Sequence, residues 1–591
     1  MKIKVSDYII QLLEEKGIDT AFCITGGAAA HLMESLRTSK IKVTHNYNEQ
    51  ACAMAADGYA RIAKKPAMVL VTNGPGSTNT ITGVLGAWQD SIPMFVLSGQ
   101  VPTNQTMAAE PGSIRQLGLQ ESDIIPMVEN CTNFAIQLTS KDWIKWEVDK
   151  AWESMMTGRK GPVWLDVPID IQAEMIETDD QKEYKLVPHG EQPGVMLPTA
   201  LLDAIRNAKQ PLIVAGNGIH LANAEAELKD IVQYLQIPVV CTWNATDLFD
   251  YHDPLYVGNF GLLGERAANF AVQQADMLLV LGSRLSIPCT GYNSKDFASK
   301  AVKIMVDLDV NEIRKHTLKI DFEVVADVKD FIPTLRKQIG QCNVVKSWTD
   351  KIMGWKKRFP VTEEPLHTRD DDHINSFDLI AELGNCLTKN TVVVTDMGTA
   401  FTCTMQSLRS NGSNRLFTSS SLCSMGFGLP GAIGAYRANE TNRVICMAGD
   451  GGFQMNIQEL QTVAQYKLPI KIILFNNSGY LAVSLMQDNL FDQQHFGSDN
   501  DSGVGAPNFC AVALAYGIAA YRLTTPEEIE DLRSLLEEPG PALIEINMVR
   551  NQLLIPRVMS RKDASGKITS GSIDSMYPFL SDEVIAEVKG K

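Results

Sequence analysis

Two short apolar runs in the last third of the chain each end in a polar residue, and this pattern constrains the fold more than any other feature. Residues 443–448 run into Gly449-Asp450-Gly451, and residues 471–475 run into Asn476-Asn477. Short, mostly apolar runs bounded by polar or turn residues are typical of buried parallel strands. Ligands bind beyond the carboxyl ends of such strands in a doubly wound sheet, so we expect Asp450 and Asn477 to lie together at a ligand site.

The residue types at these two strand ends suit a hydrated cation. Asp450 and Asn477 carry the hard oxygen atoms that Mg²⁺ prefers, and Mg²⁺ keeps open positions for phosphate oxygens. The glycines beside Asp450 allow the backbone to approach a diphosphate closely. The sequence therefore predicts a magnesium site that holds a diphosphate. The alternative is that both segments are ordinary strand-end turns.

The size and charge of the chain narrow its class. Its 591 residues exceed what one hydrophobic core supports and suit three domains. The formal net charge of −16 argues against nucleic acid as a partner, because no basic stripe is available for phosphates. No apolar run is long enough to cross a bilayer, and the N-terminus lacks the apolar core of a signal peptide. Eleven scattered cysteines without metal-type spacing favour reduced thiols and a cytoplasmic enzyme.

Strand and helix patterns alternate along most of the chain, which predicts the α/β class with mostly parallel, doubly wound sheets. We expect three such domains, at residues 1–180, 197–345 and 376–555. A polar stretch at 179–192 is expected to link the first two domains. A more polar tail at 556–591 is expected to wrap the surface or cover the site.

The Gly-Asp-Gly and Asn-Asn motifs, at their observed separation, resemble the signature of thiamine diphosphate (ThDP) enzymes. Residues 424–430 (Ser-Met-Gly-Phe-Gly-Leu-Pro) and 454–460 (Gln-Met-Asn-Ile-Gln-Glu-Leu) resemble the acetolactate (acetohydroxyacid) synthases within that class. The resemblance runs from about Val5 to about Ile546. It implies a first domain for the ThDP pyrimidine, a nucleotide- or FAD-binding-like middle domain, and a third domain for the diphosphate and Mg²⁺.

The resemblance also implies roles for single residues. Mg²⁺ is bound in the family by the side chains at Asp450 and Asn477 and by the carbonyl of Gly479, and Met425 holds ThDP in its bent shape. The turn at the pyrimidine side contains Gly74, Pro75 and Asn79, and the diphosphate side contains Asp396, Gly398, Gly449, Gly451 and Gly452. The sequence departs from the family after Gly398, where Thr399-Ala400 replaces the usual polar pair.

Glu49 matches the family position of the catalytic carboxyl, which holds N1′ of the pyrimidine and drives its tautomerisation by general acid–base catalysis. Glu49 is also expected to begin an alanine-rich helix. The alternative is therefore that its negative charge only stabilises the N-terminus of this helix by a favourable interaction with the helix dipole. Gln120 matches a family glutamine near the reacting centre, and its alternative is an exposed loop amide. In the family the first and third domains meet across a subunit interface, which implies a homo-oligomer of at least two chains with the active site between them.

The middle domain has the arrangement that binds a structural, non-redox FAD in acetolactate synthases. Residues at the ends of its expected strands match that site, namely Gly216, Gly218, Arg284, Asp307 and Asp327. Many relatives keep the same fold without FAD, so a degenerate domain is the alternative.

Four positions near the acceptor side depart from the family. Pro288 replaces an arginine that grips the acceptor carboxylate, and Ile169 replaces a lysine at the active-site entrance. Met486 replaces a tryptophan of the acceptor pocket, and Ala482 replaces its methionine partner. The loop at 103–120 is also longer than in the family, and long loops beside a site usually serve recognition. These changes predict a wider and less cationic pocket; neutral drift is the alternative.

The sequence therefore predicts a carboligase, a transferase that decarboxylates pyruvate and passes the two-carbon unit to a carbonyl acceptor. A bulky ketone without a carboxylate, such as a keto-sugar nucleotide, suits the altered pocket, and a second pyruvate giving acetolactate is the alternative. Simple 2-keto acid decarboxylase fits less well, because pyruvate-type decarboxylases carry two adjacent histidines and no two of the nine histidines here are adjacent. Pyruvate oxidase is a further alternative; it needs a redox flavin, which pyruvate would bleach. A non-catalytic subunit is disfavoured by Glu49, Asp450 and Asn477.

Overall fold

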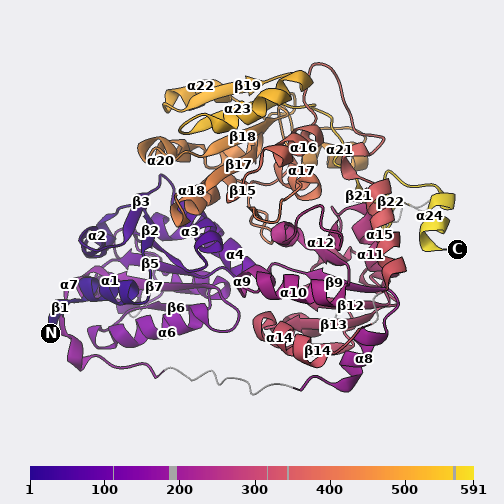
Figure 1. Cartoon of the computed structure of the whole chain (residues 1–591). Helices are drawn as coiled ribbons and strands as arrows, with labels where there is room; N and C mark the ends of the chain where they lie inside the picture. Colours follow the sequence, from indigo (N-terminus) through magenta and orange to yellow (C-terminus); the bar gives the residue numbers. More distant parts are fainter. Residues whose placement is uncertain (111, 186–195, 316, 343–344, 563–567, 591) are drawn as a thin grey trace.

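The computed structural model describes the chain except residues 111, 186–195, 316, 343–344, 563–567 and 591. Three α/β domains follow one another, each built on a six-stranded parallel sheet, as the sequence predicted. Helices cover both faces of each sheet (Figure 1). The first domain lies beside the middle domain, and the third domain packs over both.

The first domain has the strand order β3-β2-β4-β5-β7-β6. Strand β4 lies in the interior of this sheet, and its five residues are all buried. A short antiparallel pair, β1 with β8, closes one side. The strands are β1 Lys2–Lys4, β2 Thr20–Cys23, β3 Lys42–His45, β4 Ala67–Val71, β5 Met94–Gln100, β6 Phe134–Gln137, β7 Pro162–Pro168 and β8 Met175–Glu177. The helices are α1 Val5–Glu15, α2 Ala30–Arg37, α3 Glu49–Ala63, α4 Pro75–Asp90, α5 Ile125–Val128, α6 Ile144–Met156 and α7 Ile169–Ala173.

The middle domain has the strand order β11-β10-β9-β12-β13-β14. Counted along the domain this is the order 3-2-1-4-5-6 of dinucleotide-binding sheets. Its strands are β9 Pro211–Ala215, β10 Val239–Cys241, β11 Tyr256–Asn259, β12 Met277–Leu281, β13 Val302–Asp307 and β14 Phe322–Val325. Its helices are α8 Thr199–Asn207, α9 Gly218–Leu221, α10 Glu225–Leu235, α11 Arg266–Gln274, α12 Ile287–Thr290, α13 Val310–Arg314, α14 Val328–Gln338 and α15 Lys346–Arg358. Trp348 and Trp355 of α15 share a buried cluster with Phe270 of α11, so α15 packs with this domain.

The third domain has the strand order β16-β15-β17-β18-β20-β19, which repeats the order of the first domain. The two predicted strand ends are neighbours, because β17 pairs with β18. Its strands are β15 Thr391–Thr395, β16 Arg415–Phe417, β17 Arg443–Gly449, β18 Lys471–Asn476, β19 Ala519–Leu523 and β20 Ala542–Asn547. Its helices are α16 Ser376–Cys386, α17 Thr399–Ser407, α18 Gly428–Ala438, α19 Asp450–Gln454, α20 Leu460–Gln465, α21 Leu481–Leu490, α22 Phe509–Ala515 and α23 Leu532–Glu537.

Helices α3 and α18 join the first and third domains through direct backbone contact. A Cβ atom on Gly58 would overlap the carbonyl of Gly431, and one on Gly434 would overlap the carbonyl of Ala55. One hydrophobic cluster continues across this contact from both sheets. The two domains are therefore packed as tightly as the parts of a single core.

The tail packs on the middle domain. Strand β21 (Arg557–Val558) pairs with β24 (Met576–Tyr577), and the chain ends in α24 (Asp582–Lys589). The remaining short strands are β22 (Ser560–Lys562) and β23 (Ile568–Ser570). The fully buried Arg266 donates to the carbonyl of Pro578 at 2.7 Å, and Asn269 donates to that of Ile573 at 2.9 Å. Buried polar anchors of this kind fix the tail on the surface of the domain.

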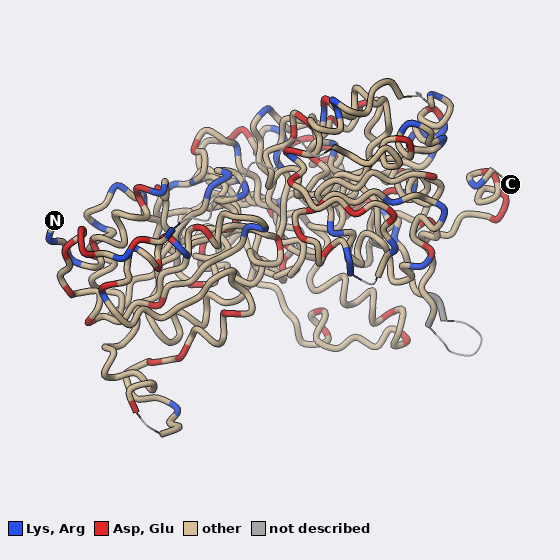
Figure 2. Tube along the Cα trace, turned by 90° about the horizontal axis from the view of Figure 1, so that it is seen from below, with Lys and Arg blue, Asp and Glu red and all other residues tan. Residues whose placement is uncertain are grey.

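Among the described residues no helix is both long and apolar enough to cross a bilayer. Lys and Arg are interspersed with Asp and Glu along the trace (Figure 2). All eleven cysteines are free thiols.

Candidate functional site

The ends of β17 and β18 bring Asp450 and Asn477 to one place, as the sequence predicted. Asp450 begins the short helix α19, and its carboxylate accepts from the backbone N–H of Gly451 at 2.7 Å and of Gly479 at 2.9 Å. The second of these bonds ties the end of β17 to the turn that follows β18. The next residue, Tyr480, donates its N–H to the carbonyl of Ser498 at 2.7 Å and fixes that turn from the other side.

The electrostatics and hydrogen bonding of this pair suit a cation site. Burial raises the pKa of Asp450 to about 6, although backbone N–H bonds oppose the shift. The Oδ1 atom of Asn477 is buried and has no hydrogen-bond partner among the described residues, while its Nδ2 faces the hydroxyl of Thr399 at 3.4 Å. A buried orphan acceptor is costly unless a ligand satisfies it. Asp450 and Asn477 therefore fit a hard cation such as Mg²⁺, which takes few protein ligands.

We expect the affinity of the metal-free protein for Mg²⁺ to fall as the pH drops below about 6, because protons then compete for the Asp450 carboxylate. The loss should approach tenfold per pH unit. The raised pKa also means that this carboxyl favours the folded state at low pH and that this stability is lost as pH rises through 6. Mg²⁺ should therefore stabilise the protein more at pH 8 than at pH 5. Titration calorimetry and thermal melts between pH 5 and 8 check both points; a flat affinity profile would contradict this role of Asp450.

The glycines around the pair make room for protein groups. A Cβ atom on Gly451 would overlap the ring of Tyr480, and one on Gly452 would lie 2.7 Å from Asp396 Oδ1. Gly449 precedes α19 and has open space beside it, the nearest neighbouring atom to a Cβ there being the Met397 carbonyl at 3.9 Å. Close packing against Tyr480 and Asp396 thus explains why positions 451 and 452 have no side chain.

Asp396 and Gly398 lie at the end of β15, next to the pair. The Asp396 carboxylate accepts from the N–H groups of Met397 at 2.7 Å, Gly426 at 3.1 Å and Gly428 at 3.1 Å, and burial raises its pKa to about 6. Its oxygens are therefore engaged in fixing the turn after Met425. Gly398 adopts φ 82° and precedes α17, whose first residue Thr399 faces Asn477. The departure from the family at Thr399 thus keeps a hydroxyl at the site.

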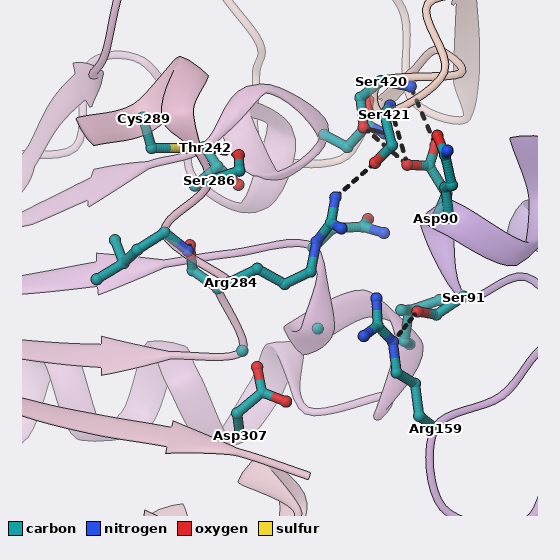
Figure 3. A pocket seen from close by; sticks show the side chains of 18 of the residues that line it. Asp90, Ser91, Arg159, Thr242, Arg284, Ser286, Cys289, Asp307, Ser420 and Ser421 are labelled. Atoms are coloured by element: carbon teal, nitrogen blue, oxygen red, sulfur yellow. Dashed lines mark hydrogen bonds between the residues drawn. The ribbon is translucent and has the colours of Figure 1, made fainter. Parts of the chain in front are cut away.

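All three domains hold the segment from Thr418 to Gly428, here called the Met425 segment. Asn244 of the middle domain donates to the carbonyl of Thr418 at 3.0 Å and accepts its N–H at 3.1 Å. Asp90 of the first domain accepts the N–H groups of Ser420 and Ser421 (Figure 3). Arg284 donates to the Ser421 hydroxyl at 2.6 Å. The position of Met425 therefore depends on groups from every domain.

Glu49 is the first residue of α3, positioned by Asn48, whose side chain accepts the N–H of Gln50. The half-buried Glu49 carboxylate accepts from Asn79 Nδ2 of α4 at 3.0 Å. Gly74 and the exposed Pro75 form the turn into α4, with Gly74 at φ 60°.

Gln120 packs directly on this turn, because a Cβ atom on Gly74 would overlap its carbonyl. Gln120 has φ 58°, a left-handed conformation that is unusual for a residue other than glycine. The structure thus gathers at one edge of the domain the predicted first-domain residues Glu49, Gly74, Pro75, Asn79 and Gln120.

The loop at 103–120 is organised by Glu121, a residue that the sequence did not single out. The buried Glu121 carboxylate accepts the N–H groups of Leu117 at 2.8 Å and Gly118 at 3.1 Å, and also that of Met107. No local pattern separates this buried glutamate from a surface one. Its bonds join Met107 to Leu117 and Gly118, so they tie two parts of the loop together next to Gln120.

A cavity of about 1020 Å³ lies at the carboxyl ends of the middle sheet and reaches the other two domains. Figure 3 shows Arg284 directed at Ser421 and Arg159 directed at Ser91 within it. The predicted residues that line it are Gly218, Arg284, Asp307, Asp327 and Pro288. Burial raises the pKa of Asp307, whereas the Asp327 side chain caps α14. Gly216 is not among the lining residues, because it packs against the backbone of Gly282.

The four acceptor-side residues lie on three domains. Pro288 of α12 lines the cavity, and Arg284 and Lys315 line it too, so the cavity is not free of cations. Ile169 begins α7 in the first domain. Ala482 and Met486 are exposed on α21 in the third domain. One chain does not place the four in a single cavity among the described residues.

Three segments of the chain match models of the thiamine pyrophosphate (TPP) enzyme family. Thiamine pyrophosphate is the older name for ThDP. Residues 3–127 match the N-terminal TPP binding domain, 199–335 the central domain and 396–546 the C-terminal TPP binding domain.

Named relatives extend over nearly the whole chain. A probable acetolactate synthase large subunit of Methanococcus aeolicus is 34% identical, with 91% of each chain covered. The acetolactate synthase large subunit of Parasynechococcus marenigrum is 32% identical, covering 93% of this chain and 88% of its own. Acetolactate synthase isozyme 1 large subunit of Escherichia coli is 29% identical, covering 94% and 95%. The chain therefore belongs to the thiamine pyrophosphate enzyme family and is a ThDP-dependent enzyme that forms carbon–carbon bonds.

Proposed function

We propose that the protein decarboxylates pyruvate and joins the two-carbon unit to a carbonyl acceptor, with Mg²⁺ and ThDP bound at the ends of β15, β17 and β18. The observation that carries this proposal is the buried, unsatisfied Oδ1 of Asn477 beside the Asp450 carboxylate. When bound, ThDP supplies the carbanion centre at which carbon–carbon bonds break and form. Asp450, Asn477 and the carbonyl of Gly479 would hold the metal, and Met425 would support the bent cofactor.

Glu49 would hold the proton at the pyrimidine N1′ as a general acid–base, and Gln120 would lie near the reacting atoms. We place this half of the site against the third domain of a second chain, in a homodimer or homotetramer. Exposed apolar side chains beside Glu49 and Gln120 support an interface there, since Tyr47 is 53% exposed and Leu119 is 85% exposed. The eleven free thiols support a reducing compartment such as the cytoplasm.

A second pyruvate is the acceptor that the relatives' names favour, and acetolactate would be the product. Lys315, which lines the same cavity as Pro288, offers a cation for an acceptor carboxylate. The test is incubation with ThDP, Mg²⁺ and pyruvate alone, followed by an assay for acetolactate. Rapid formation supports this acceptor; free acetaldehyde would instead indicate a decarboxylase, and bleaching of a bound flavin an oxidase.

A bulky ketone such as a keto-sugar nucleotide is the second candidate, and the small or uncharged residues at Pro288, Ile169, Ala482 and Met486 favour it. We expect Met486→Trp to slow turnover with a large acceptor about tenfold or more while leaving pyruvate decarboxylation within about twofold, because the added ring narrows only the acceptor side. Steady-state kinetics for both reactions give the comparison. Val483→Ala on the same helix is the control; equal effects of Met486→Trp on both reactions would contradict this pocket.

We further propose that the middle-domain cavity binds FAD in a structural role. The strand order 3-2-1-4-5-6 and a cavity of about 1020 Å³ at the strand ends support a dinucleotide. We expect the purified protein to release a yellow chromophore on denaturation, measured by its absorbance and fluorescence. Arg284→Met should lower the flavin content, whereas Arg314→Met, on an exposed surface, should not. A colourless protein that fails to bind added FAD would contradict this proposal.

A further inference from the structure

The third domain holds the turn that presents Glu49 through a buried carboxylate. Glu459 is 0% exposed and ends the 3₁₀ turn before α20. One of its oxygens accepts the backbone N–H of Tyr47 at 2.9 Å. The other accepts from Asn46 Nδ2 at 2.8 Å and from the Thr462 hydroxyl at 2.7 Å. Burial raises the pKa of Glu459, and these donors oppose the shift.

Two further contacts hold the same turn from the same side. The Tyr466 hydroxyl accepts the N–H of His45 at 2.9 Å, and the Asn456 side chain faces Gln50 Oε1 at 3.4 Å. Residues on both sides of Glu49 are thus held by residues 456–466, and Figure 1 shows α20 beside β3. A shift of the turn before Glu49 would therefore break bonds to the third domain.

Asn456 also reaches the Met425 segment. Its Nδ2 donates to the carbonyl of Gly426 at 2.8 Å, and a Cβ atom on Gly426 would lie 2.9 Å from that nitrogen. A single short stretch, residues 456–459, therefore contacts both the turn before Glu49 and the residue after Met425. These residues belong to the Gln-Met-Asn-Ile-Gln-Glu-Leu motif, to which the proposed chemistry assigns no task.

We propose that Glu459 is a positioning residue for Glu49: it fixes the His45–Asn48 turn so that the Glu49 carboxylate meets the pyrimidine of ThDP in the productive orientation. The inference rests on the proposed role of Glu49. A misplacement of about 1 Å in a catalytic group costs roughly 100-fold in rate, so loss of this grip should affect proton transfer far more than cofactor affinity.

A matched pair of substitutions separates the hydrogen bonds of the Glu459 carboxylate from the volume of its side chain. Glu459→Met keeps the length of the side chain but leaves the Tyr47 N–H and the Asn46 amide without an acceptor. Glu459→Gln can still accept the Tyr47 N–H, and Asn46 can turn its amide to accept from the new side chain, because its own Oδ1 has no partner among the described residues. Thr462→Val is the control in the adjoining helix α20. It removes one donor to the carboxylate and a 3.5 Å contact of the Thr462 hydroxyl with the His45 carbonyl, but Glu459 can still accept from Tyr47 and Asn46.

Two readouts test the proposal on the full-length enzyme. The first is amide hydrogen exchange of the peptide spanning residues 45–50 without cofactor, where Glu459→Met should lose protection and Glu459→Gln should keep it. The second is the exchange of the C2 proton of bound ThDP with D₂O, which we expect to be about 10- to 100-fold slower in Glu459→Met and within about threefold of wild type in Glu459→Gln and Thr462→Val. ThDP affinity should change less than threefold in all of them.

Unchanged protection of the peptide, or wild-type C2 exchange in Glu459→Met, would overturn the proposal. If Glu459→Met does not fold, Tyr466→Phe loosens the same turn at His45 and should slow C2 exchange measurably; wild-type exchange there would have the same force. Glu49→Gln distinguishes failure of the proposed role of Glu49 from failure of the positioning role of Glu459. Wild-type C2 exchange in that variant would refute the role of Glu49 itself, whatever the hydrogen exchange of the 45–50 peptide shows. The double variant Glu49→Gln/Glu459→Met should be no slower than Glu49→Gln alone.

Discussion

Glu49→Gln should slow turnover by about 10²- to 10⁴-fold while ThDP still binds, because a general acid–base contributes about this much and an amide cannot exchange the proton. The substitution keeps the shape of the side chain and its contact with Asn79 Nδ2, now through the amide oxygen. The measurements are kcat with pyruvate, the rate of C2 proton exchange, and the dissociation constant of ThDP.

The matched control is Glu129→Gln, a glutamate in the same domain whose side chain is exposed. It should leave all three quantities within about twofold of wild type. Turnover at the wild-type rate in Glu49→Gln would refute its assignment as the catalytic carboxyl. A loss confined to ThDP affinity would show that Glu49 serves binding alone.

Asp450→Asn should abolish activity through loss of the metal. Residues that only orient a metal ligand cost 10–100-fold in affinity when changed, so replacing the charged ligand itself should weaken Mg²⁺ binding by at least about 100-fold. ThDP affinity should fall with it, because a cation held by Asp450 would neutralise the charge of the diphosphate. Calorimetric titration of Mg²⁺ and ThDP measures both, and excess Mg²⁺ should restore part of the activity.

Asp350→Asn on the exposed side of α15 is the control and should bind both ligands normally. Mixing the two inactive variants adds a test of the shared site. If Glu49 of one chain serves the metal site of another, hybrid dimers of Glu49→Gln and Asp450→Asn contain one intact site, and activity should reappear after subunit exchange. Continued inactivity of verified hybrid dimers would place both residues in the same site of one chain.

The sequence was sufficient for the sheets and for the strand ends that carry Asp450 and Asn477. Those features follow from local apolar runs and from the general position of ligands in parallel sheets. The buried carboxylates could not be predicted from the sequence, because their burial depends on partners far along the chain. Glu459, for example, bonds to Asn46, which lies 413 positions away. Glycines gave a mixed result, since a glycine indicates close approach but does not identify what approaches. Gly216 accordingly packs against Gly282 instead of lining the cavity.

The fixation of the Met425 segment by all three domains limits how this chain can be recombined. Asn244 and Arg284 come from the middle domain and Asp90 from the first, yet all bond to one segment of the third. A chimera that imports a middle domain from a relative must therefore bring a matching amide and guanidinium, or the imported domain will fold while the thiamine site loses its support. The domains are modular in topology, but the thiamine site depends on contacts that match between them.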